Sequence, residues 1–400
     1  MIIDATSIYF YIEDPIEDED VNLEVTNGYS RDKRPDLKQV NLMIGINEEY
    51  IPLFFESFSG NTSDVEMFQE SLKLLRNKFR SILKSVQKRY IVVDNGNISE
   101  GEYKTVEDLD IFCKKYNMDY IAGLKKTKVA NELQKMKIYP NTLEKDLGDP
   151  IYVSDKTKIY GYTIEKKIYG AKRKVLLYYN SKVEKRQRIK FEEKIAKIRS
   201  KIDEINKDND IEHTIKKDRI ESLLRSKSML TLFNIDEQEN QINCRIIEKE
   251  KQKRENMCGK SAIFSNNLSL SAKDMIRIYK SKSKVEHEFR LLKNLFWIRS
   301  VNHRKPKRIK THIAIVMWGI MLMALLKNVL KQYKQNYTFE TLFEVIKKSK
   351  LSYGVYKYPD LAKEYIIYKI TNINKELEDI FARLGLSYDY FDIDVAPTKP

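Results

Sequence analysis

The spacing of hydrophobic residues divides the chain into regions of strand and regions of helix. Short runs of β-branched and aromatic residues predict strands, whereas hydrophobic residues recurring every three or four positions predict helices. In the first third of the chain these patterns predict three strands, a helix, a strand, a helix and a strand. The corresponding ranges are 1–13, 39–46, 50–58, 64–86, 90–93, 105–116 and 119–124.

The middle of the chain has a different pattern. Residues 151–179 are strand-like and rich in tyrosine, and 261–264 predict a return strand. Residues 182–227 are dense in Lys, Glu, Arg and Ile and predict a helical hairpin with a break near 206–210. A solvated helical pair with ion pairs between neighbouring turns explains this stretch; a contact with DNA or with a second copy is the alternative.

The last third is predicted to be mostly helical. A long helix begins near residue 272, and 338–385 is expected to be helical apart from a Tyr/Pro loop at 353–359. The longest apolar run, 313–326, is short for a membrane span, so 311–332 is predicted to be a buried helix. The N-terminus has no features of a signal peptide, and no membrane partner is expected.

Composition narrows the class of partner. The chain has 73 Lys and Arg residues against 58 Asp and Glu residues, giving a net charge of +15, which favours a long polyanion. Its three cysteines form no CxxC pair, which argues against structural zinc and disulfides and fits a reducing cytoplasm. No Gly-rich phosphate loop is present, so no nucleotide cofactor is expected.

Charged residues near position 280 have helical spacing. Tyr279, Lys282, Glu286, Arg290 and Lys293 follow one another at intervals of 3, 4, 4 and 3, which would place them on one face of a single helix. A carboxylate among cations suits a site that binds a metal ion and a phosphate backbone together.

Two further carboxylates occupy positions that a sheet could bring near Glu286. Asp4 lies inside the first predicted strand, and Asp94 follows the buried strand at 90–93. If these strands are neighbours and the helix packs across them, the three carboxylates would share Mg²⁺ or Mn²⁺. Taken singly, each has an ordinary explanation, since Asp often caps a turn and Glu is usually a solvated helical residue.

A basic stretch follows the charged helix. Residues 299–310 would contact DNA phosphates beside the site, or would form only a basic loop before the apolar helix. The candidate DNA contacts in this stretch are Arg299, His303, Arg304 and Lys307.

Five ordered segments resemble one family. Tyr279-x2-Lys282-x3-Glu286-x6-Lys293 resembles the Tyr-Arg-Glu-Lys signature of the DDE transposases of bacterial insertion sequences. Asp4-Ala5-Thr6 and residues 90–99 are similar to the segments around the two catalytic aspartates of that family. Residues 28–39 and 60–64 match two further characteristic stretches.

The resemblance implies a fold and a domain order. The fold would be α/β, with an RNase H-like mixed sheet flanked by helices and a β-plus-helical insertion between the second Asp and the Glu. Residues 1–128 would form the first part of the core and 129–270 the insertion. Residues 271–335 would complete the core with the helix of the catalytic Glu, and 336–400 would be a C-terminal helical region.

The resemblance also implies an activity. The chain would catalyse Mg²⁺-dependent (or Mn²⁺-dependent) DNA cleavage and strand transfer at transposon ends, as a homodimer on double-stranded DNA. Asp4, Asp94 and Glu286 would be the catalytic metal ligands. Tyr279, Lys282 and Lys293 would contact the DNA end, and Arg290 would join them on the same helical face. The protein would be bacterial, cytoplasmic and associated with the nucleoid.

Two departures keep alternatives open. Lys282 stands where the signature has arginine, and lysine lacks the bidentate fork of a guanidinium. The chain also starts three residues before Asp4, so the resemblance covers a catalytic region lacking the N-terminal DNA-binding part. The alternative is therefore a truncated, catalytically silent DNA-binding remnant that regulates a full-length transposase. A structure-selective nuclease of the same fold is a third possibility.

Overall fold

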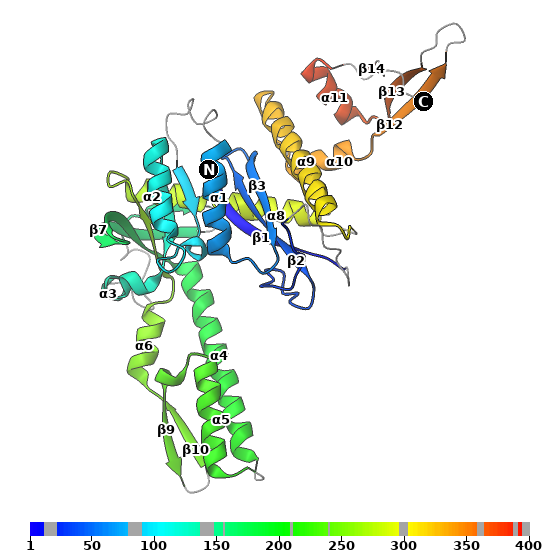
Figure 1. Cartoon of the computed structure of the whole chain (residues 1–400). Coiled ribbons are helices and arrows are strands. Elements are labelled where there is room, and N and C mark those ends of the chain that lie inside the picture. The colour runs from blue at the N-terminus through cyan, green and yellow to red at the C-terminus, as the bar shows by residue number, and fades with distance from the viewer. Residues whose placement is uncertain are drawn as a thin grey trace. The chain divides into compact units, whose positions relative to one another are not determined.

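The computed structural model forms two units, residues 1–71 with 282–400 and residues 72–281, and each is described by itself (Figure 1). The residues that the structure describes are 1–11, 22–78, 90–136, 148–154, 157–208, 211–238, 241–295, 303–357, 364–386 and 391–393. Predictions for Arg299, for the end of the helix at 64–86 and for part of the Tyr/Pro loop lie outside them.

The first unit contains the strand that carries Asp4. Strands β1 (Ile2–Tyr9), β2 (Gln39–Ile46) and β3 (Pro52–Ser59) are antiparallel in the order β3-β2-β1. All eight residues of β2 are buried, including the polar side chains of Gln39 and Asn41. Asp4 is paired with Ile44, which fixes its position within the sheet. Ser63 accepts a hydrogen bond from the Glu66 N–H and so caps α1 (Asp64–Lys78), which continues into the second unit.

Helices cover this part of the first unit. They are α8 (Ser283–Asn294), α9 (Pro306–Gln332), α10 (Phe339–Ile346) and α11 (Lys375–Leu384). Helix α8 packs against β1 and β2, and α9 packs against β3. A shared core joins the helices and includes Leu291, Met323, Leu330, Phe339 and Leu342.

The C-terminal tail is only partly helical, so the expectation of a helical region was wrong for its middle. Strands β12 (Lys350–Lys357), β13 (Glu364–Thr371) and β14 (Phe391–Ile393) form an antiparallel sheet between and after the helices. The tyrosines and β-branched residues of 350–357 and 364–371 favour the extended backbone. The predicted Tyr/Pro loop begins inside the first of these strands.

The second unit is built on a six-stranded array in the order β4-β5-β11-β8-β7-β6. Strands β4 and β5 are parallel, and β11 is antiparallel to β5 and β8. These strands are β4 (Tyr90–Val93), β5 (Asp119–Leu124), β6 (Tyr152–Ser154), β7 (Thr157–Ile168), β8 (Ala171–Asn180) and β11 (Lys260–Ser265). Four helices lie between β4 and β6 along the chain. They are the 3₁₀ helices η2 (Asn95–Asn97) and η3 (Lys126–Val129) and the α-helices α2 (Thr105–Tyr116) and α3 (Ala130–Lys135).

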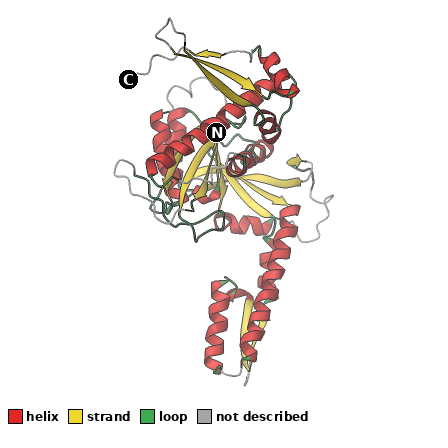
Figure 2. Ribbon diagram, turned by 90° about the vertical axis from the view of Figure 1, so that its right-hand side faces the viewer, coloured by secondary structure: helices red, strands yellow, loops and turns green. Residues whose placement is uncertain are grey.

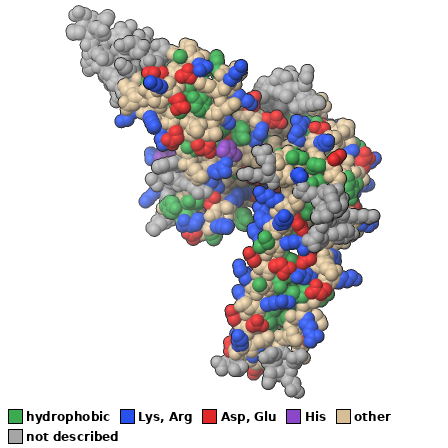
Figure 3. All heavy atoms as spheres, turned by 180° about the vertical axis from the view of Figure 1, so that it is seen from behind, with side chains coloured by type: hydrophobic (Ala, Val, Ile, Leu, Met, Phe, Trp, Pro, Cys, Tyr) green, Lys and Arg blue, Asp and Glu red, His purple; other side chains and the backbone are tan. Residues whose placement is uncertain are grey.

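A helical arm extends from this array within the second unit (Figures 1 and 2). It comprises α4 (Ser181–Lys207), α5 (His213–Ser226), η5 (Leu230–Leu232), β9 (Phe233–Gln238), β10 (Gln241–Ile246) and α6 (Glu248–Asn256). Its own core contains Ile198, Ile220, Leu224 and Leu232. Basic and acidic side chains are interspersed along it (Figure 3), and ion pairs such as Arg188–Glu184 join successive turns, which supports the solvated helical pair.

The helix predicted to begin near residue 272 is two helices. Helix α7 (Ala272–Lys280) is capped by Ser271 and ends at Ser281, and α8 begins at Ser283. At the junction the Ser281 N–H and its hydroxyl both donate to the Ile278 carbonyl, at 3.1 and 2.6 Å. A serine that bonds to the backbone of the preceding turn competes with the regular helical ladder. Tyr279 therefore lies on α7, and Glu286, Arg290 and Lys293 lie on α8, instead of on a single helix.

Helix α8 also buries a carboxyl group. Glu288 is 1% exposed, and among the described residues its Oε1 atom has no hydrogen-bond partner. Burial raises the pKa of Glu288 to about 8, although the Lys327 ammonium opposes this shift. The carboxyl group is therefore mostly protonated at neutral pH.

Glu288→Gln is expected to alter how stability depends on pH. The pKa of Glu288 in the folded protein, about 8, lies above its ordinary value of 4.5. The contribution of the protonated Glu288 carboxyl to the free energy of unfolding is therefore fully present below pH 4.5 and is lost as pH rises through 8. The variant should match wild type near pH 5 and exceed it by on the order of 3 kcal/mol near pH 8. Urea unfolding at both pH values measures this. Glu344→Gln, an exposed residue of α10, is the control, and equal pH slopes for wild type and Glu288→Gln would contradict the prediction.

Candidate active site

Asp4 lies within β1, near the partly buried guanidinium of Arg31. Its Oδ1 atom accepts the Ala5 N–H at 2.9 Å, which orients the carboxylate. Arg31 is close enough for the negative charge of Asp4 to raise the pKa of its guanidinium, although burial lowers this pKa by more. The strand therefore presents Asp4 in an electropositive surrounding.

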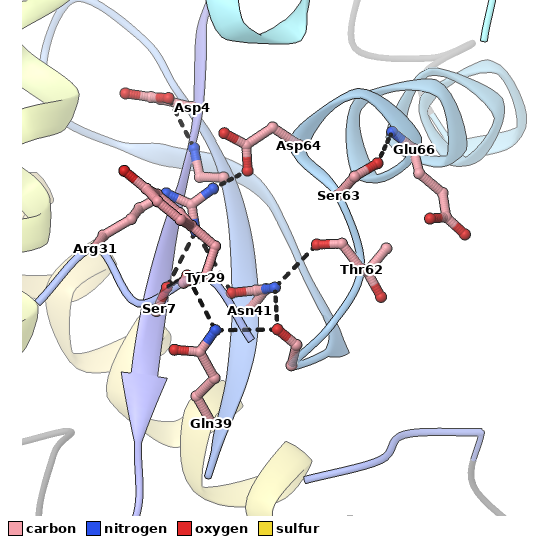
Figure 4. Close-up of polar contacts among 12 residues, drawn as sticks. Asp4, Ser7, Tyr29, Arg31, Gln39, Asn41, Thr62, Ser63, Asp64 and Glu66 are labelled. Carbon is pink, nitrogen blue, oxygen red and sulfur yellow. Dashed lines mark hydrogen bonds and ion pairs between the residues drawn. The ribbon is translucent and has the colours of Figure 1, made fainter. Parts of the chain in front are cut away.

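Arg31 connects three separate stretches of the first unit (Figure 4). It forms an ion pair with Asp64 at the start of α1. It also donates to Ser7 Oγ of β1 at 3.1 Å and to Asn41 Oδ1 of β2 at 3.4 Å. The side chain is 20% exposed, so these bonds are partly shielded from water. One guanidinium thus holds the loop before β2 against β1, β2 and the first turn of α1.

Two buried amides hold the loops around Arg31 (Figure 4). Gln39 Nε2 donates to the Tyr29 and Gly60 carbonyls at 3.1 and 3.0 Å. Asn41 Nδ2 donates to the Gly60 and Thr62 carbonyls at 3.0 and 3.1 Å. A Cβ atom at position 60 would lie 2.2 Å from the Gln39 carbonyl oxygen, so only glycine fits this close approach. The stretches 28–39 and 60–64, which resemble family motifs, therefore pack against each other.

Asp94 lies in the second unit, directly after β4. Its Oδ1 atom accepts the Asn95 N–H at 2.7 Å and so caps the short helix η2. The Tyr279 hydroxyl of α7 donates to the same oxygen at 3.4 Å. Gly123 of β5 makes room for this arrangement, because a Cβ there would lie 2.8 Å from the Asn95 nitrogen and 3.0 Å from the Tyr279 hydroxyl.

Glu286 lies in the first turn of α8, on the helix that packs against β1. Its side chain is 62% exposed, and Lys282 Nζ is 3.9 Å from its Oε1. A carboxylate this open to solvent can accept a cation or a ligand. Asp4 and Glu286 thus belong to the first unit, and Asp94 belongs to the second.

The predicted DNA contacts have different surroundings. Lys293 pairs with Asp32 at 2.8 Å, and these side chains are only 11% and 15% exposed, so Lys293 supports the loop at 28–39. Arg290 is exposed and lies 2.5 Å from His287 Nδ1. Arg304 and Lys307 are exposed at the start of α9, where the His303 and His312 rings lie 5.7 Å apart.

The described residues contain no group of three His, Cys, Asp or Glu side chains close enough to hold a metal ion. The donor chemistry nevertheless suits a hard cation, since Asp4, Asp94 and Glu286 all offer carboxylate oxygens. The convergence of these three carboxylates therefore remains a prediction.

Sequence comparison identifies the class of protein to which this fold and these carboxylates belong. The family described as "Transposase DDE domain" matches residues 1–322, so the chain belongs to this family of DNA-cleaving and DNA-joining enzymes. No curated protein matches the chain. The match confirms the DDE transposase class predicted from the sequence, and the mixed α/β structure is consistent with the predicted RNase H-like fold. It also implies a DNA substrate and divalent metal ions.

Sequence reasoning assigned no role to several residues that organise this region. Arg31, Asn41 and Asp64 lie within or beside the stretches that resemble family motifs, and that resemblance was the available signal. Asp32 could have been recognised only from its contact with Lys293, which is distant in sequence. Gly123 likewise gave no local signal, because its importance depends on atoms from η2 and α7.

Arg31→Lys is expected to destabilise the first unit. Lysine keeps the charge but cannot contact Ser7, Asn41 and Asp64 together, so the free energy of unfolding should fall by about 1–3 kcal/mol. Urea unfolding measures the loss. Arg34→Lys in the same loop is the matched control, because Arg34 pairs with the exposed Asp36 and should tolerate the change. Equal stability of the two variants would refute the role given to Arg31.

Gly123→Ala is expected to disturb the turn that holds Asp94. The added methyl group would overlap the Asn95 backbone and crowd the Tyr279 hydroxyl, so unfolding should become easier by about 1–3 kcal/mol. Gly101→Ala serves as the control, since a Cβ there would make only an ordinary contact of 3.6 Å with Ser99. Thermal unfolding of both variants compares them, and an unchanged melting temperature for Gly123→Ala would disprove the close packing.

Proposed function

We propose that this transposase cleaves DNA at the ends of an insertion sequence and transfers the cut strand to a target, using Asp4, Asp94 and Glu286. The observation that carries the proposal is the family match across residues 1–322, a range that includes all three carboxylates. Their placement within a strand, directly after a strand and on a helix packed against β1 supports it.

The three carboxylates would hold Mg²⁺ or Mn²⁺, which would activate the phosphodiester bond as a Lewis acid. The backbone N–H groups of Ala5 and Asn95 orient the carboxylates of Asp4 and Asp94. The Tyr279 hydroxyl restrains Asp94, and the nearby Lys282 ammonium offsets the charge of Glu286. These contacts restrict the carboxylates before a substrate binds, so less conformational entropy is lost on binding.

Basic residues of the first unit would bind the DNA backbone. Lys282, Arg290, Arg304 and Lys307 are proposed phosphate contacts, with His303 beside them, and Arg299 is proposed from sequence alone. Lys293 would join them only if DNA phosphate displaced Asp32. Two copies acting on the two ends of one element would form a homodimer, within the bacterial cytoplasm and at the nucleoid. No observation favours the alternative of a catalytically silent remnant.

Replacing a proposed metal ligand should abolish cleavage. With Mg²⁺ and a plasmid carrying the two terminal sequences of the element, Glu286→Gln, Asp4→Asn and Asp94→Asn should each nick more than about 100-fold more slowly than wild type. This threshold follows because changes next to metal ligands alone cost about 10–100-fold. Nicked and joined products are separated on gels, and joined products also distinguish a transposase from a simple nuclease.

Glu344→Gln is the matched control, since Glu344 is 56% exposed against 62% for Glu286 and lies on a different helix. DNA binding in Ca²⁺ verifies that each variant is folded. Nicking by Glu286→Gln at the wild-type rate would remove Glu286 from the site.

A further inference from the structure

Helix α9 exposes a continuous apolar stripe. Its members are Ile315, Trp318, Leu322, Leu325 and Val329, and Tyr333 extends it directly after the helix. Each of these side chains is between 36% and 63% exposed. At 100° per residue they fall within an arc of roughly 80°. The prediction that 311–332 is a buried helix is therefore wrong for this face.

The opposite face of α9 belongs to the core of the first unit. Ile309, Ile313, Met317, Ile320 and Ala324 are at most 1% exposed. Among the described helices α9 alone is long and apolar enough to cross a membrane, yet a third of its most apolar window is buried in the protein. A helix packed along one side cannot be surrounded by lipid, so its outer stripe needs a different explanation.

We infer that the stripe pairs with the same stripe of a second copy of this chain. Five of its members, from Ile315 to Val329, follow one another at intervals of 3, 4, 3 and 4, which is the spacing of a coiled-coil seam. Such a surface is self-complementary about a two-fold axis. DNA is a poor occupant, because no charged residue occurs between Lys310 and Lys327 to meet a phosphate.

The size and charge of the stripe fit a helix pair of limited length. The largest apolar patch of a monomer covers about 300–600 Å², and a standard interface needs about 800 Å² from each partner. The stripe consists of six large side chains, each at least 36% exposed. Basic residues occur only toward the ends of α9, at Lys307, Arg308, Lys310, Lys327 and Lys331. Two helices that cross near Leu322, the midpoint of 315–329, would keep these charges apart.

This inference rests on the proposed homodimer and adds the surface through which the two copies meet. Self-association is tested without DNA or metal, by analytical ultracentrifugation of the full chain over a range of micromolar concentrations. Wild type should be dimeric. Leu322→Glu should weaken self-association at least about 100-fold, because each copy would bury an unpaired carboxylate against its equal.

Ile189→Glu is the matched control, because Ile189 is 60% exposed on α4 and Leu322 is 63% exposed on α9. It should remain dimeric. Mixing Leu322→Glu with Leu322→Lys should restore a mixed dimer, since the two side chains would meet at the crossing point. Circular dichroism and melting temperature verify folding, and an exposed site should tolerate both changes.

A monomeric wild type would overturn the inference, as would a Leu322→Glu variant that dimerises like wild type. Monomers that sediment with phospholipid vesicles would overturn it in favour of a membrane contact. These outcomes are separate from the proposed function: a dimer that neither nicks nor joins DNA would refute only the activity. Monomers that nick and join would refute only the pairing surface.

Discussion

The first unit depends on one permanent positive charge that is partly shielded from water. A guanidinium removed from water must be surrounded by acceptors, because an unpaired buried charge is very costly. Arg31 meets this requirement with Asp64, Ser7 and Asn41, which come from a helix start and two strands. The same charge lies in the field of Asp4, so the loop that completes the fold also sets the electrostatic surroundings of a proposed catalytic residue.

In the second unit, the carboxylate of Asp94 is held by neutral hydrogen-bond donors. Asp94 caps a short helix through a backbone N–H and receives a phenol hydroxyl from α7, and a glycine on β5 leaves space for both. Arg31 and Gly123 therefore both affect a proposed catalytic carboxylate. Arg31 places a positive charge near Asp4, and Gly123 leaves space for the groups that bind Asp94. Arg31 lies in a stretch that resembles a family motif, whereas Gly123 has no local signal, and both roles depend on atoms brought together by folding.

Hydrophobic periodicity predicted most elements of the core, since each β-strand or helix there buries one apolar face or stripe. Hydrophobic periodicity gave wrong predictions where the structure depends on side-chain hydrogen bonds or on packing against other parts of the molecule. The helix near 280 is divided because Ser281 bonds back to Ile278, a contact that periodicity does not register. The strands at 350–357 and 364–371 were missed because their tyrosines and β-branched residues were given too little weight against a helical pattern. Apolar content predicted burial of α9 but could not show that only one side has a partner in its own chain.

The helical arm of the second unit has a consequence for cooperativity. Its isoleucines and leucines pack among α4, α5, β9 and β10 in a cluster separate from the one around β5, β7, β8 and β11. Two apolar clusters in one chain need not melt together, and sub-global opening follows such boundaries. Heat or denaturant can therefore open the arm while the strands that position Asp94 stay folded, and a single midpoint would describe neither part.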